Sequence, residues 1–148
     1  MSTYRQILFH IIFRTKKSQP TIQIENSQEL YAFMAGIIKN KGCFLYIING
    51  MENHIHILTD LHPGIALADL VRDIKTYSSM WLKQSDKFPQ FYGWAEGYAA
   101  LTYTYREKEK IINYIKKQQI HHRKETFEQE YRRILEEYGI KIDERYFP

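Results

Sequence analysis

The sequence offers almost nothing that could stabilise a fold by covalent cross-links or hold it in a membrane. Its 148 residues include a single cysteine, Cys43, which excludes an internal disulfide and any cluster of thiolate ligands around a metal. No apolar run is long enough to cross a bilayer, and the N-terminus lacks the pattern of a signal peptide. We therefore expect a cytoplasmic protein, with the Cys43 thiol buried in the apolar run CFLYII.

Repeats and low-complexity linkers are absent too, and so is the glycine-rich phosphate-binding loop of nucleotide hydrolases. A chain of this length buries roughly 70% of its unfolded surface, which is enough for one sizeable core. The hydrophobic fraction of 44% and the charged fraction of 26% are typical of globular proteins. The sequence therefore predicts one domain over residues 1–148 and no nucleotide cofactor.

Positive charge is in modest excess and aromatic residues are abundant. The net charge is +4 and the pI is close to 9.0, which favours polyanionic partners without proving that the chain binds nucleic acid. The chain also contains 12 tyrosines and 8 phenylalanines. Aromatic faces interleaved with Lys and Arg suit a surface that binds single-stranded nucleic acid, although most of these rings will belong to the core.

The pattern of apolar residues predicts alternating strands and helices. In chain order we expect a strand over 5–13, a helix from Asn26 to Gly42, a strand over 43–48, a tight reversal at Asn49-Gly50, a strand containing His54, a helix over 67–82, a strand within 91–105, a helix over 107–124 and a helix from Thr126 to Tyr138. This order is the βαββαβ arrangement of the ferredoxin-like α+β fold, which has an antiparallel sheet, followed here by additional C-terminal helices.

Three local signals mark the ends of the later helices. Thr104 with Glu107, and Thr126 with Gln129, have the spacing of a capping box at a helix start. Gly139 is placed to end the last helix.

The stretch NHIHILTDL carries the most informative motif. On a strand, His54 and His56 point to the same side and lie about 7 Å apart along the chain. Imidazole is the commonest protein ligand for divalent metals, so the pair is a candidate metal site. A His-Ile-His alternation could equally be the solvent face of an ordinary edge strand.

A second pair of polar residues lies in the expected helix 107–124. Tyr114 and Gln118 are four residues apart, hence neighbours on one face. A tyrosine hydroxyl with its ordinary pKa of about 10 is a poor nucleophile, and a divalent ion that polarises a phosphate can compensate for this. The side-chain amide of Gln118 could supply an oxygen ligand to an ion held by His54 and His56.

With both pairs in place the chain resembles the single-tyrosine transposases of the HUH (His-hydrophobic-His) class, which mobilise insertion sequences as single-stranded DNA. The resemblance extends over FRTKK, NHIHIL, LVRDIKTYSSMWL, GWAEGYAALTY and YIKKQ. Related proteins associated with repeated chromosomal palindromes (REP elements) often have Asn at the position of Gln118, so the insertion-sequence branch is the nearer one. Some relatives have an acidic metal ligand three residues before the first histidine, where this chain has Met51; whether Glu52 or Asp60 compensates is open.

The resemblance implies a metal-dependent endonuclease for DNA transposition and recombination. It implies that His54, His56 and Gln118 bind Mg²⁺ or Mn²⁺ and that Tyr114 is the nucleophile, forming a 5′-phosphotyrosine and a free 3′-hydroxyl. It also implies a homodimer that binds single-stranded DNA with hairpin ends. Candidate phosphate contacts are Lys16, Lys17, Arg72, Lys75, Arg123 and Lys124, although a solvated surface charge is the commoner role for each of them.

Other functions fit parts of the pattern. A catalytically silent nucleic-acid-binding or regulatory relative would have the same fold, and a zinc hydrolase could use His54 and His56 with His121 or His122. The zinc hydrolase lacks a glutamate base of the HExxH type. His121-His122 lie near a predicted helix end, where capping is expected, and His62 has no predicted role. His10 lies in the first strand, as core or as site lining.

Overall fold

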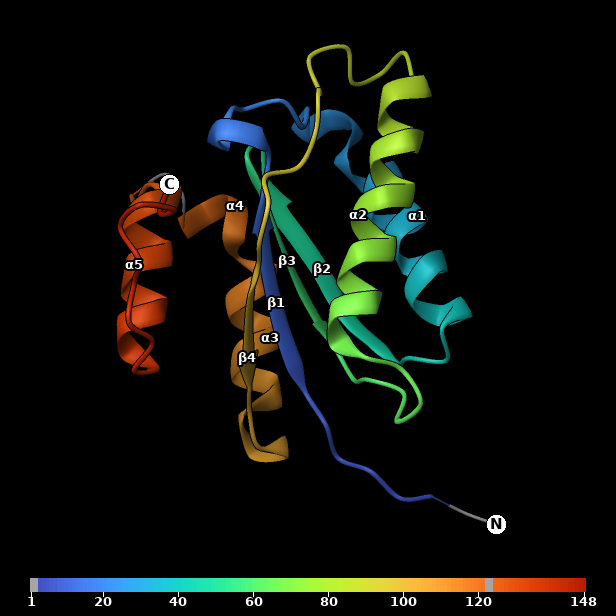
Figure 1. Ribbon diagram of the computed structural model, residues 1–148, viewed down its shortest axis with the longest axis vertical. Coiled ribbons are helices and arrows are strands. Elements are labelled where there is room, and N and C mark those ends of the chain that lie inside the picture. The colour runs from blue at the N-terminus through green and yellow to red at the C-terminus, as the bar shows by residue number, and fades with distance from the viewer. Residues whose placement is uncertain (1–2, 122–123) are drawn as a thin grey trace.

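The computed structural model describes residues 3–121 and 124–148. Among these residues, four antiparallel strands form one sheet in the order β2-β3-β1-β4 (Figure 1). The strands are β1 (Phe9–Arg14), β2 (Leu45–Met51), β3 (His54–Thr59) and β4 (Ala99–Thr102). This strand order and the alternation of strands with helices confirm the predicted ferredoxin-like α+β fold.

Helices cover both faces of the sheet (Figure 1). On one face lie α1 (Ser27–Asn40) and α2 (Leu67–Gln84), and on the other lie α3 (Lys108–Lys116), α4 (Gln118–His121) and α5 (Phe127–Glu137). Short 3-10 turns span Lys16–Ser18, Ile24–Asn26 and Tyr105–Glu107. No described helix combines the length and apolar character that crossing a membrane requires.

The alternation of side chains along the strands creates two cores. Ile11, Phe13, Ile55 and Ile57 pack towards α1 and α2. Ile12 and Leu58 pack towards α3 and α5. His56 lies opposite Ile12 in the β1–β3 ladder, and His54 lies opposite Arg14. Because side chains two residues apart share a face, His10, His54 and His56 all belong to the face covered by α3 and α5.

The hairpin that carries the histidines turns later than predicted. Asn49 and Gly50 lie inside β2, and the turn consists of Glu52 and Asn53. Gly50 is required in the strand because a Cβ there would lie 2.2 Å from the backbone oxygen of His54. The Asn49 side chain donates to the backbone oxygens of Ile115, at 3.0 Å, and Lys116, at 3.2 Å. Asn49 therefore fixes the end of α3 to the sheet.

The predicted helix over 107–124 is interrupted. The capping box of Thr104 and Glu107 is present and begins a 3-10 turn that leads into α3. Lys117, with φ −95° and ψ 13°, ends α3, and Gln118 starts the separate helix α4. Tyr114 and Gln118 are therefore on adjoining helices rather than on one. Residues 122–123 lie outside the described residues, and Lys124 lies in a turn, so the helix does not continue to the predicted residue 124.

The lengths of β1 and β4 follow their pairing with neighbouring strands. The predicted strand over 5–13 begins only at Phe9, where pairing with β3 and β4 begins. Within 91–105 only Ala99–Thr102 pairs with β1, after Gly97 with its positive φ of 82°. The capping box of Thr126 and Gln129 starts α5 as predicted. Gly139, at φ 72°, ends that helix: its own N–H and that of Ile140 bond back to the last turn.

Candidate active site

Two strand residues and two helix residues meet on the face covered by α3, α4 and α5. His54 and His56 come from β3, Gln118 from the start of α4, and Glu130 from α5. All four side chains are completely buried. The Nε2 atoms of His54 and His56 lie 3.4 Å and 3.3 Å from Oε1 of Glu130. The imidazoles therefore converge on one carboxylate.

Gln118 connects this group to α4. Its Oε1 lies 3.1 Å from Nε2 of His54, and its Nε2 donates to Oε2 of Glu130 at 2.6 Å. The ring of Phe127, also on α5, stacks on the ring of His54 with a centroid distance of 4.1 Å. Helix α5 therefore closes the site over the strand histidines.

In both histidines the ring nitrogen that does not face Glu130, Nδ1, also has a polar partner. Nδ1 of His54 lies 2.8 Å from Oδ1 of Asn53, and Nδ1 of His56 lies 2.7 Å from Nε2 of His10. His10 in turn contacts the hydroxyl of Tyr103 through Nδ1, at 2.9 Å. Burial, followed by the neighbouring His56, lowers the pKa of His10 well below its ordinary value, so its imidazole is neutral.

The residues present fit a divalent cation. One ligand atom from each of His54, His56 and Glu130 lies within 4.8 Å of the others. Two imidazole nitrogens with carboxylate and amide oxygens form a donor set that suits first-row divalent metals, and the oxygens also suit Mg²⁺.

Tyr114 lies at the edge of the same group. Its hydroxyl donates to Oε2 of Glu130 and accepts a hydrogen bond from Nη2 of Arg133 at 3.1 Å. Its ring centroid is 6.1 Å from that of His56. Burial raises the pKa of the Tyr114 phenol, and the negative charge of Glu130 raises it further, while Arg133 opposes this shift. The hydroxyl is therefore protonated at neutral pH.

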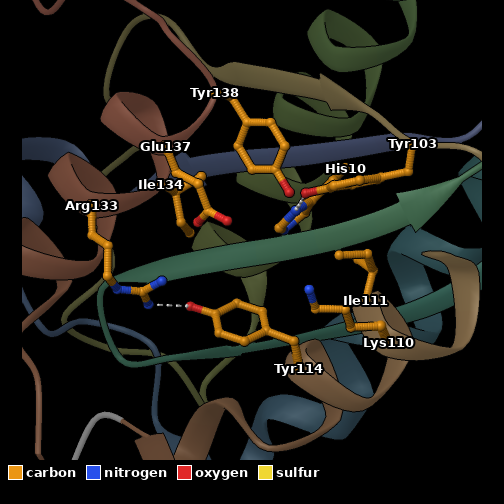
Figure 2. Close-up of a pocket in the computed structure, with 9 residues that line it drawn as sticks. All are labelled: His10, Tyr103, Lys110, Ile111, Tyr114, Arg133, Ile134, Glu137 and Tyr138. Carbon is orange, nitrogen blue, oxygen red and sulfur yellow. Dashed lines mark hydrogen bonds between the residues drawn. The ribbon is translucent and has the colours of Figure 1, made fainter.

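A cavity of about 160 Å³ opens beside the Tyr114 hydroxyl, between α3 and α5 (Figure 2). Cationic, anionic and aromatic side chains from both helices project towards it, and it reaches down to His10 on β1 and to Tyr103, which directly follows β4. The lining residues are His10, Tyr103, Lys110, Ile111, Tyr114, Arg133, Ile134, Glu137 and Tyr138. The nucleophile candidate thus faces a small cavity as well as the buried carboxylate.

The sequence prediction missed Glu130. Neither acid considered there lies in this group: Asp60 pairs with Arg5 at 2.9 Å, and Glu52 is in the hairpin turn. A signal for Glu130 exists, because it lies three residues after Phe127 and four before Ile134, on the apolar face of an amphipathic helix. A carboxylate on such a face needs buried polar partners, and here it has them.

The six predicted phosphate contacts have different surroundings. Lys16 and Lys75 line an open groove of about 400 Å³, together with Lys83, Tyr92 and Trp94. Lys75 donates to the backbone oxygens of Ala95 and Gly97, and burial lowers its pKa to about 8.

The other predicted contacts lie elsewhere. Arg72 pairs with Asp69 and Asp73, which offset its charge. Lys17 and Lys124 are exposed, and Arg123 lies outside the described residues. Of the remaining histidines, His62 accepts a hydrogen bond from the backbone of Gly64 at 3.0 Å in a loop, and His122 also lies outside the described residues.

Comparison with known proteins gives a consistent result. Residues 3–118 match the family model described as IS200-like transposase. A candidate transposase from Deinococcus radiodurans R1 is similar in structure, with a TM-score of 0.58 and 24% identity, over 80% of this chain and 95% of that one.

A REP-associated tyrosine transposase bound to a REP hairpin is similar over 82% of this chain and 74% of its own, with a TM-score of 0.61 and 13% identity. Both identities are below 25%, so the similarity to these two structures shows that the fold is shared and nothing more. None of the curated proteins compared with the chain matches it.

Proposed function

The chain belongs to the IS200-like transposase family, and from this premise we propose that it cleaves and rejoins single-stranded DNA through a covalent bond to Tyr114. A single observation carries the proposal. The Tyr114 hydroxyl, the two Nε2 atoms of the histidine pair and the Gln118 amide all meet at the carboxylate of Glu130. A nucleophile and metal ligands held at one point are what a metal-assisted phosphoryl transfer requires.

In the proposed reaction the oxygen of Tyr114 attacks the phosphorus of a backbone phosphodiester. The new bond is a 5′-phosphotyrosine, and the bond to the 3′-oxygen breaks, with a proton from solvent completing the free 3′-hydroxyl. Glu130 is the hydrogen-bond acceptor of the phenol, hence the nearest group to receive its proton. Arg133, which donates to the same oxygen, would stabilise the phenolate and the phosphate. Reversal at a new junction would rejoin the strand.

His54, His56 and Gln118 would hold Mg²⁺ or Mn²⁺, with Glu130 as a further oxygen ligand. When bound, the ion would polarise the phosphate under attack and neutralise developing charge. The chain's own residues do the rest of the positioning. Asn49 holds the end of α3, and with it the nucleophile's helix, against β2.

The substrate would be single-stranded DNA with a hairpin end. The similar REP-associated transposase is bound to a hairpin, which supports this partner. The groove lined by Lys16, Lys75 and Lys83 lies where β1 ends, and Arg14 at that end is opposite His54. Phosphates bound in the groove would lie at the same end of the sheet as the histidine pair. The homodimer remains a prediction, which sedimentation measurements would test.

One observation favours a second candidate, a DNA-binding module that does not cut. The proposed metal ligands are fully buried beneath α5, so a phosphate reaches them only if that helix moves.

An assay with labelled DNA separates the two candidates. The protein is incubated with Mg²⁺ or Mn²⁺ and either a single-stranded hairpin end or its fully paired duplex. We expect a denaturant-resistant protein–DNA adduct with the single strand only. Binding without an adduct would favour the second candidate, and efficient duplex cutting would contradict both.

A further inference from the structure

His10 on β1 is a buried histidine to which the proposed reaction gives no task. Its side chain is 1% exposed. Its ring lies 5.0 Å from that of His56, centroid to centroid, and 6.0 Å from that of Tyr103. Both ring nitrogens are occupied: Nε2 lies 2.7 Å from Nδ1 of His56, and Nδ1 lies 2.9 Å from the Tyr103 hydroxyl. His10 therefore links a proposed metal ligand to a tyrosine at the wall of the cavity (Figure 2).

The chemistry of imidazole determines how this link must be protonated when His56 binds a cation. A neutral imidazole has one N–H and one bare nitrogen, and only the bare nitrogen can bind a metal. The nitrogen of His56 that faces the site is Nε2, so its proton must be on Nδ1. Nδ1–H can donate to His10 only if Nε2 of His10 is bare. The proton of His10 is then on Nδ1, which donates to the Tyr103 oxygen.

If the hydrogen bonds of this chain ran in the opposite direction, His56 could not bind a metal ion. If Tyr103 donated to His10, and His10 to His56, then Nε2 of His56 would be protonated and would point at Glu130. The hydrogen-bond acceptor for the other ligand, His54, is different in kind. Oδ1 of Asn53 only accepts, so it always favours the bare Nε2 on His54. The metal-binding form of His56, in contrast, depends on His10.

We propose that His10 is a positioning residue for the metal centre, which fixes His56 in the tautomer with a bare Nε2 and is itself oriented by Tyr103. This inference rests on the metal site of the proposed function. Hydrogen-bond partners of metal-bound histidines orient the ring and raise its basicity, and their loss typically costs about 10–100-fold in metal affinity. His10 would supply this contribution from the strand next to β3.

Nuclear magnetic resonance of the wild-type protein reads the tautomers directly. The protein is labelled with ¹⁵N in its histidines, and long-range ¹H–¹⁵N correlations are recorded in saturating Mg²⁺, which is diamagnetic. We expect His10 and His56 both to carry their proton on Nδ1. A His10 that carries its proton on Nε2, or on both nitrogens, in the Mg²⁺-loaded protein overturns the inference.

Two substitutions of similar size test the same point by calorimetric titration with Mn²⁺. In His10→Gln the side-chain oxygen can still accept from Nδ1 of His56, so we expect an affinity within a few-fold of wild type. In His10→Leu no acceptor remains, and we expect a loss of about 10–100-fold. His62→Leu, which removes a loop histidine, is the matched control and should bind like wild type. Thermal melts without added metal show whether each variant is folded.

The outcomes separate this inference from the proposed function. If wild type binds Mn²⁺ and His54→Ala does not, the metal site stands. Wild-type affinity in His10→Leu would then overturn the role of His10 alone. Equal losses in His10→Gln and His10→Leu, with both variants folded, would also overturn it, because the acceptor would not matter. If wild type binds no Mn²⁺ or Mg²⁺, the metal site itself is wrong.

Discussion

The hydroxyl of Tyr114 donates a hydrogen bond to the carboxylate of Glu130, and the amide of Gln118 donates to the same oxygen. Glu130 thus sits where the nucleophile and the proposed ligands meet. The carboxylate comes from α5, which lies beyond the residues that match the family model. This helix both completes and covers the site.

We predict that α5 moves when substrate binds. Because His54, His56 and Gln118 are fully buried, a phosphate can reach them only after the residues of α5 open locally. Amide hydrogen exchange over Phe127–Glu137 should become faster when single-stranded hairpin DNA is bound. Helix α1, which packs on the other face of the sheet, is the internal control and should not change. Unaltered protection of α5 in a covalent complex would show that DNA enters by another route.

Tyr114→Phe should abolish the covalent adduct and leave hairpin binding close to wild type. The aromatic ring is retained, so packing changes little, but Glu130 loses one hydrogen-bond donor. Removing a hydrogen bond to a charged group typically costs about 1.5–3 kcal/mol, so a moderate fall in the free energy of unfolding is expected. Denaturant unfolding and a gel assay measure the two effects. An adduct that persists in this variant means that another tyrosine is the nucleophile.

The proposed ligands should differ in how strongly activity depends on them. His54→Ala or His56→Ala removes an imidazole at the centre of the site and should abolish cleavage at any practical metal concentration. Gln118→Ala leaves the histidine pair and Glu130, so part of its activity should return with more Mn²⁺. Wild type should melt at a higher temperature when metal is added, because an ion that binds only the folded state stabilises it. Identical metal affinity in wild type and the double-histidine variant would refute the site.

DNA affinity should depend on the protonation of Lys75. Burial lowers its pKa to about 8, so the ammonium is mostly charged at pH 7 and mostly neutral at pH 9. Binding of single-stranded DNA should therefore weaken between these pH values, and Lys75→Gln should flatten this dependence. Arg72→Gln is the control, since Asp69 and Asp73 already pair with that guanidinium. Fluorescence anisotropy at constant ionic strength gives the affinities, and an unchanged pH profile in Lys75→Gln would exclude this lysine from the interface.

The same shift has a consequence for stability. The folded-state pKa of Lys75 is below its unfolded value of about 10.4, so folding favours the neutral form. Its contribution to the free energy of unfolding is complete above about pH 10.4 and is lost as the pH falls through about 8. Lys75→Gln should remove this part of the pH dependence.

The fold could be predicted because both faces of the sheet are covered and each element has its own signal. The period of two in β3 and the apolar stripe of α2 are strong local patterns. The predicted position of the hairpin turn was wrong. Asn49-Gly50 is a favourable turn sequence, but tertiary contacts hold it in a strand. Gly50 is needed for a close backbone approach, and Asn49 binds the end of α3. Such contacts are not encoded within a short stretch of sequence.

The sequence predicted four residues of the candidate site but not its carboxylate, Glu130. His54, His56, Tyr114 and Gln118 meet in space, whereas the acid among them was sought near the histidines in sequence and lies on α5. The position of the Glu130 carboxylate depends on how α5 packs against the sheet, and local sequence patterns do not predict the packing of a distant helix. The role of His10 could not be predicted for the same reason, because its contact with His56 arises from the register of β1 against β3.

The central claim is that Tyr114 forms the bond to DNA, and mapping the adduct tests it most directly. Trypsin should release residues 111–116 as the peptide IINYIK, in which Tyr114 is the only tyrosine. After incubation with a single-stranded hairpin end and Mg²⁺, nuclease and trypsin digestion, and tandem mass spectrometry, we expect this peptide to carry a nucleotide through its 5′-phosphate. An unmodified peptide together with a nucleotide on any other residue, or cleaved DNA with no covalent adduct at all, would contradict the account.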